Sequence, residues 1–160
     1  MAYHKVVLVE GFCDASCSGN PGPGAAAAIL VARDGQLVAR EIEVVSDVTA
    51  LTTNQREELK GGILVLEQLK RPTRITITSD SRYLVDGMTK WMAGWVRKGW
   101  RTAGGDPVAN QDLWQRLQEL AARHEVDWQW VKGHAGHPYN ERCDKLAVAA
   151  VRRYQQERRG

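Results

Sequence analysis

The chain has 160 residues, of which 43% are hydrophobic and 26% are charged, as is usual for globular proteins. This length predicts a single domain, over residues 1–160, with room for a hydrophobic core. The formal net charge of +3 permits a nucleic-acid partner without requiring one.

Apolar runs are too short for a membrane protein. No stretch of 18 apolar residues occurs, and the first residues lack a signal-peptide pattern. We therefore expect a cytoplasmic protein without membrane association, and a monomer, because the assigned core leaves no long apolar stripe exposed. The cysteines Cys13, Cys17 and Cys143 form an odd set without a CxxC pair, which predicts reduced structural thiols.

The first third of the chain predicts an antiparallel meander. Residues 6–14 alternate in the manner of a strand, and residues 25–32 and 37–45 follow as two more. Asp34 and Gly35 between the last two are a strong hairpin signal.

The next segment predicts a helix that ends before Pro72. Residues 52–54 offer a hydroxyl or an amide as N-cap. Apolar side chains recur at helical spacing, and Glu58 heads a mostly apolar row whereas Glu57 does not. Periodicity therefore favours Glu58 over Glu57 as the inward-facing acid.

The second half predicts strands alternating with helices. Residues 74–78 form a β-branched strand that ends before Asp80, and residues 126–130 alternate as a fifth strand. Helices are expected at 81–96 with interruptions near Gly87 and Gly94, from Asn110 or Asp112 to 123, and from Pro138 to about 154. Together, the predicted strands and helices indicate an α/β fold with a mixed five-stranded sheet.

Four acids stand near predicted strand ends or helix starts: Asp14, Glu58, Asp80 and Asp144. If the strands before Asp14 and Asp80 are parallel neighbours, the two side chains meet where open α/β sheets bind ligands. Each like-charge pair about 4 Å apart would cost about 4 kcal/mol at an effective dielectric near 20. Alone, each acid is more often a helix cap; together they predict hard divalent cations.

Four stretches carry a family resemblance: 18–24 (Ser-Gly-Asn-Pro-Gly-Pro-Gly), 52–59, 112–117 (Asp-Leu-Trp-Gln-Arg-Leu) and 130–144, which contains Gly-His-Ala-Gly-His-Pro. In this order they resemble bacterial ribonuclease HI, the type 1 ribonuclease H family. The resemblance implies a ribonuclease H-like fold whose sheet is flanked by about five helices. It also implies an endonuclease that hydrolyses the RNA strand of RNA–DNA hybrids, leaving 5′-phosphate and 3′-hydroxyl ends.

The resemblance further implies the catalytic groups. The same four carboxylates match those that hold two Mg²⁺ ions, typically about 3.5–4 Å apart, with Mn²⁺ as an alternative ion. Asp14 would bridge both ions, one activating a water and the other stabilising the leaving 3′ oxygen. His134 matches a mobile histidine that assists proton transfer or product release. Outside the resemblance His134 would be an ordinary loop residue, and we interpret His137 as structural.

Contacts to the hybrid are implied by the same resemblance. The matching positions are Cys17, Asn20, Asn54 and Gln55 for the minor groove and its 2′-hydroxyls, Thr53 and Asn20 for a DNA phosphate, Asn140 beside the active site, and Trp91, Lys98 and Arg101 in a basic protrusion. Arg82 departs from the family, where glutamine is common, and could gain a phosphate contact. On the residues alone, Asn20 and Asn54 could be turn and cap residues, and Trp91 could pack one helix on another.

The chain also departs from the family. Ala15 follows the first aspartate where glycine is usual, and its methyl group could crowd the approach of the backbone to RNA. Gln55 is longer than the common asparagine. The protrusion has few lysines, which predicts weaker affinity for the hybrid rather than lost chemistry. Two other functions stay open, a non-catalytic hybrid-binding module and another nuclease built on the same sheet, such as a junction resolvase or an integrase. The joint presence of four acids argues against the first, and the asparagines that match 2′-hydroxyl readers argue against the second.

Overall fold

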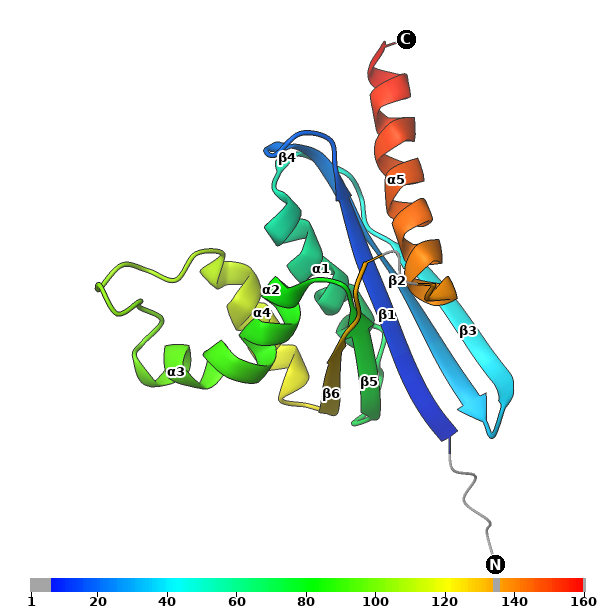
Figure 1. Cartoon of the computed structure of the whole chain (residues 1–160), viewed down its shortest axis with the longest axis horizontal. Helices are drawn as coiled ribbons and strands as arrows, with labels where there is room; N and C mark the ends of the chain where they lie inside the picture. Colours follow the sequence, from blue (N-terminus) through cyan, green and yellow to red (C-terminus); the bar gives the residue numbers. More distant parts are fainter. Residues whose placement is uncertain (1–6, 134–135, 160) are drawn as a thin grey trace, which may run out of the picture.

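The protein folds around one mixed sheet with helices on both faces (Figure 1). The structure is a computed structural model and describes residues 7–133 and 136–159. Its strands are β1 (Val7–Cys17), β2 (Gly22–Asp34), β3 (Leu37–Val45), β4 (Thr49–Thr52), β5 (Arg74–Ser79) and β6 (Glu125–Trp130). Its helices are α1 (Asn54–Glu67), α2 (Arg82–Asp86), the π-helical turn η1 (Gly87–Trp91), α3 (Met92–Arg97), α4 (Gln111–Ala121) and α5 (Pro138–Arg159).

The sheet has the strand order β3-β2-β1-β5-β6. The β1–β2 and β2–β3 pairs are antiparallel, whereas β1–β5 and β5–β6 are parallel. The predicted meander is thereby confirmed. The first and fourth predicted strands are parallel neighbours, which is the condition under which Asp14 and Asp80 were expected to meet. The short strand β4, which pairs with β2, was not predicted and makes the sheet six-stranded.

Side chains of β1 and β2 alternate between two hydrophobic cores. Cys13 faces the core that includes Leu59 of α1 and Trp114 of α4. Phe12 faces the opposite core, with Cys143 of α5. The sheet is therefore covered by α1 and α4 on one face and by α5 on the other. The three cysteines are free thiols, as predicted.

Several predicted boundaries were wrong at their ends. β1 continues past Asp14 to Cys17, because β2 keeps pairing with it after β5 has left. α5 runs to Arg159 rather than to about 154, and its last turns extend beyond the sheet (Figure 1). Gly94 lies inside α3 and interrupts nothing.

Gly87, in contrast, does mark an irregular turn. It begins η1, and a Cβ at this position would lie 2.0 Å from a ring carbon of the fully buried Trp114. Only glycine lets the helix approach this indole. The described residues contain no helix long and apolar enough to cross a membrane.

Candidate active site

Asp14 and Asp80 are placed together by the parallel pairing of β1 and β5. The last paired residues are Cys13 and Ser79, and each aspartate follows directly. Asp14 was predicted to end β1. It lies inside β1 instead, as the first residue after the pairing with β5 ends. Their proximity follows from register alone, because neighbouring strands lie about 4.8 Å apart.

The carboxyl group of Asp14 is held in an unfavourable electrostatic position. Burial, followed by the charge of Asp80, raises the pKa of Asp14 to about 7, and Asp144 adds to the effect. The Ala15 N–H donates to Asp14 Oδ1 over 2.8 Å and opposes the rise. The nearby Asp80 side chain thus favours the protonated form of Asp14.

Asp144 comes from α5, which covers the face of the sheet opposite α1. It lies on the second turn of α5 and lines a narrow cleft with Asp14, Asp80 and Asn140. Asn140 is only 8% exposed, and its Nδ2 donates to the Thr78 carbonyl over 3.2 Å. Within the described residues its Oδ1 is buried without a hydrogen-bond partner, so an acceptor remains available at the cleft.

Glu58 approaches the aspartates through Ser81. The Ser81 hydroxyl donates to Glu58 Oε2 over 2.8 Å and itself accepts from the Leu84 N–H, capping α2. Burial raises the pKa of Glu58, the Ser81 hydrogen bond opposes this, and the charge of Asp80 adds to it. Glu58 therefore belongs to the same charged group.

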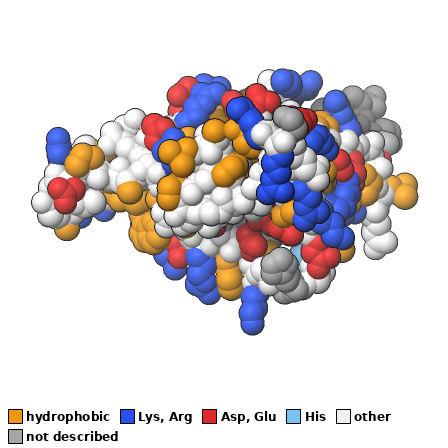
Figure 2. Space-filling model, turned by 90° about the horizontal axis from the view of Figure 1, so that it is seen from above, with side chains coloured by type: hydrophobic (Ala, Val, Ile, Leu, Met, Phe, Trp, Pro, Cys, Tyr) orange, Lys and Arg blue, Asp and Glu red, His pale blue; other side chains and the backbone are white. Residues whose placement is uncertain are grey.

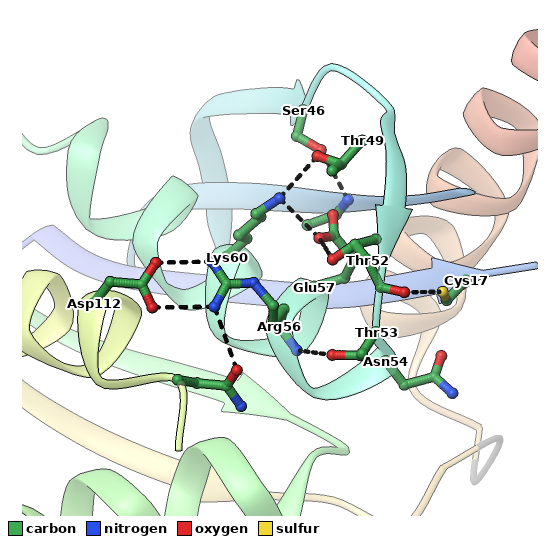
Figure 3. Close-up of polar contacts among 12 residues, drawn as sticks. Cys17, Ser46, Thr49, Thr52, Thr53, Asn54, Arg56, Glu57, Lys60 and Asp112 are labelled. Carbon is green, nitrogen blue, oxygen red and sulfur yellow. Dashed lines mark hydrogen bonds and ion pairs between the residues drawn. The ribbon is translucent and has the colours of Figure 1, made fainter. Parts of the chain in front are cut away.

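Glu57, and not Glu58, is the buried acid of α1, so the prediction from periodicity was wrong. Glu57 is 0% exposed. Its Oε2 accepts from Thr52 Oγ1 and from Lys60 Nζ, each over 2.8 Å (Figure 3). Lys60 also donates to Thr49 Oγ1. The network fastens α1 to β4, and the Glu57–Lys60 spacing of three residues was its only sequence signal.

The predicted minor-groove residues come together at one rim, formed by the β1–β2 turn and the start of α1. The Asn54 N–H donates to Asn20 Oδ1 over 3.1 Å. Thr53 is the N-cap of α1 and accepts from Arg56 N. The side chains of Asn54 and Gln55 are exposed, so this rim offers polar groups to solvent.

Cys17 ties the two halves of that rim together. Its thiol donates to the Gly19 carbonyl over 2.8 Å and contacts the Thr52 carbonyl at 3.5 Å (Figure 3). Burial and the charge of Glu57 raise the pKa of this thiol. The thiol therefore stays protonated near neutral pH and acts as a donor.

The predicted protrusion is a separate part of the surface, which extends away from the sheet (Figure 1). Trp91 is 41% exposed and packs on Trp95 of the directly following α3, with ring centroids 5.9 Å apart. Lys98 is exposed, and Arg101 donates to the Gly105 carbonyl.

Arg82 and the histidines complete the predicted set. The Arg82 guanidinium lies 4.0 Å above the ring of Trp130, whose Nε1 donates to the Asp80 carbonyl. His137 is exposed and lines the cleft. The predicted role of His134 concerns a residue outside the described ranges.

The donor set suits a hard divalent cation. Its groups are carboxylate oxygens, and the negative charges that raise the pKa of Asp14 also favour a cation beside it. In residues 7–133 and 136–159, no three His, Cys, Asp or Glu side chains are arranged to hold an ion together. The chemistry therefore fits a metal, while Glu58 and Asp144 stand around the aspartate pair rather than in one closed shell.

Comparison with known proteins gives consistent matches. Residues 6–152 match the RNase H family. The ribonuclease H of Dinoroseobacter shibae is 54% identical over 136 residues, covering 85% of this chain and 86% of that protein. The crystal structure of LC9-RNase H1 superposes with a TM-score of 0.78 at 35% identity, covering 94% of this chain and 74% of that one.

A more distant structure shares the fold. LC11-RNase H1, solved in complex with an RNA/DNA hybrid, has a TM-score of 0.67 at 15% identity and covers 92% of this chain and 99% of its own.

Proposed function

The chain belongs to the RNase H family, whose members cleave the RNA strand of RNA–DNA hybrids endonucleolytically, and we propose that its reaction takes place in the cleft around Asp14 and Asp80. The observation that carries this assignment is the raised pKa of Asp14, caused by burial beside two further carboxylates. Perturbed acids in a cleft mark functional sites, because ordinary folds avoid such repulsion.

The family is generally dependent on a divalent metal, and the carboxylates of Asp14, Glu58, Asp80 and Asp144 would hold it here. We propose two Mg²⁺ ions, with Mn²⁺ as an alternative, in accordance with the four-acid set. Such ions supply Lewis acidity at the scissile phosphate and lower the pKa of an attacking water.

The chain's own residues prepare this site. Asp14 must lose its proton before it can act as a ligand, and with its pKa raised to about 7 this happens near neutral pH in the metal-free protein. Ser81 orients Glu58 through a hydrogen bond to Oε2. Asn140 offers its buried Oδ1 to the cleft. His134 would assist proton transfer or product release, and the products would carry 3′-hydroxyl and 5′-phosphate ends.

Binding of the hybrid would use two surfaces. The rim of Cys17, Asn20, Thr53, Asn54 and Gln55 would read the minor groove and its 2′-hydroxyls. Arg82 and the protrusion with Trp91, Lys98 and Arg101 would contact phosphates. The exposed side chains of Asn54 and Gln55 support the first assignment, and the exposed Lys98 supports the second. We also propose that the protein is cytoplasmic and acts as a monomer. Size-exclusion chromatography would test its oligomeric state.

The test is cleavage of an end-labelled RNA–DNA hybrid with Mg²⁺, beside duplex RNA, duplex DNA and an EDTA control. We expect metal-dependent cutting of the RNA strand of the hybrid alone, and its loss in Asp14→Asn and Asp80→Asn. Binding without cutting would instead indicate a hybrid-binding module. Comparable cutting of duplex DNA would indicate another nuclease of this fold.

A further inference from the structure

The end of α5 carries a basic group that the proposed function has not used. Arg152, Arg153, Arg158 and Arg159 lie in the last turns of the helix, and none has an acidic partner in the described part of the chain. Arg158 stacks on Tyr154, with its guanidinium 4.8 Å from the ring centroid. Viewed from this end, Lys and Arg side chains gather on a face that also shows acidic ones (Figure 2).

The direction of each arginine follows from helix geometry. At about 100° per residue, Arg152 and Arg159 lie about 80° and about 60° around α5 from Asp144, on the half of the helix centred on this residue, which lines the cleft. Gln155 falls on this side too, and its Nε2 donates to Ser18 Oγ over 2.8 Å. Ser18 belongs to the β1–β2 turn, so this side of α5 faces the rim.

Arg152 therefore lies between the cleft and the rim. At a rise of 1.5 Å per residue, it stands about 12 Å beyond Asp144 and about 4.5 Å before Gln155 along the helix axis. One strand of a duplex carries a phosphate about every 3.4 Å of its axis. A backbone that runs from the cleft to the β1–β2 turn would thus pass Arg152 within about four phosphates of the cut.

We propose that Arg152, supported by Arg159, binds backbone phosphates of the hybrid on the path from the cleft to the β1–β2 turn. This inference rests on the proposed function and extends its substrate surface to the opposite side of the cleft from the protrusion. A guanidinium is suited to the task, because its fork of donors matches two phosphate oxygens. Arg152 is exposed, so its side chain is free to meet them.

The chain offers a matched control in the next residue. Arg153 is rotated by about 100° from Arg152, onto the side of Arg142, which bonds Glu41 and Glu43 of β3. Arg152→Ala and Arg153→Ala change the net charge equally and lie in the same exposed turn. A difference between the two variants therefore reports a contact rather than the general field of the protein.

The experiment measures binding of a fluorescent RNA–DNA hybrid by anisotropy in EDTA, over about 50–200 mM salt. We expect Arg152→Ala to weaken binding roughly three- to tenfold near 0.1 M salt and to make the slope of log K against log salt shallower by about 0.9. Arg153→Ala should stay within about twofold of the unaltered protein, and Arg152→Lys should recover part of the affinity. Equal losses in both alanine variants, or no loss in Arg152→Ala, would overturn the inference.

Cleavage with Mg²⁺ separates this inference from the proposed function. Arg152→Ala should raise KM and leave kcat at saturating hybrid unchanged. Binding that depends on Arg152 in a protein that cuts nothing would refute the proposed function alone. Hybrid-specific cutting with an unchanged KM in Arg152→Ala would refute the inference alone.

Discussion

Replacing Asp14 by asparagine should stabilise the metal-free protein while abolishing its activity. The folded-state pKa of Asp14 is about 7, against a usual 3.8, and this difference corresponds to about 4 kcal/mol once the group is ionised in both states. Because the side chain is only partly buried, we expect about 2–4 kcal/mol from removing this charge. For a domain of this size the gain corresponds to roughly 4–16 °C in Tm.

The pH dependence has a defined direction. Between pH 4 and pH 7 the folded state keeps a proton on Asp14 that the unfolded chain has lost, so the stability of the unaltered protein falls as pH rises through this window. Asparagine does not titrate. The advantage of Asp14→Asn should therefore be small at pH 4 and complete near pH 8.

Urea unfolding in EDTA at pH 4, 6 and 8 would measure the effect. Asp47→Asn is the control, because Asp47 is exposed in the loop between β3 and β4. Adding Mg²⁺ at pH 8 should stabilise the unaltered protein by mass action and leave Asp14→Asn nearly unchanged. An advantage that is absent at pH 8, or equal at pH 4 and pH 8, would refute the repulsion argument.

Other side chains around the site give further predictions. Lys60→Met should lower the free energy of unfolding in urea by about 2–4 kcal/mol, because it leaves the Glu57 carboxylate buried without its cation. The double variant Glu57→Met, Lys60→Met should recover most of that loss, and equal losses in the single and double variants would contradict this reasoning. Ser81→Ala should raise the pKa of Glu58 and move the acidic limb of the cleavage pH profile upward, while Ser81→Thr keeps the hydroxyl and the profile. Gly87→Ala should cost about 3 kcal/mol, because its Cβ would meet an indole ring at 2.0 Å, and an unchanged Tm would show that the helix can shift aside.

Local sequence patterns were sufficient to predict several strands, turns and helix starts. The alternation over residues 37–45 predicted β3 with its observed bounds, and the Asp34-Gly35 pair predicted the turn before it. Pro138 begins α5 as expected. These features depend on neighbours within a few residues, which the sequence states directly.

The depth of the acids on α1 could not be predicted in this way. Periodicity assumes one apolar environment for a helix, whereas Glu57 of α1 also faces β4, and there Thr52 and Lys60 make a buried carboxylate tolerable. The length of β1 was likewise decided by β2, its partner beyond Asp14.

The sequence by itself determined the set of acids, the order of the strands and helices other than β4, and the resemblance that pointed to hybrid cleavage. Tertiary structure alone decided that burial beside Asp80 raises the pKa of Asp14, that Asn140 keeps a buried acceptor at the cleft, and that Gln155 turns one face of α5 toward the β1–β2 turn. The physical reason is that pKa values, unpaired acceptors and shared surfaces depend on distance in space. Those distances are set by the register of parallel strands and by the packing of α5, between residues far apart in the chain.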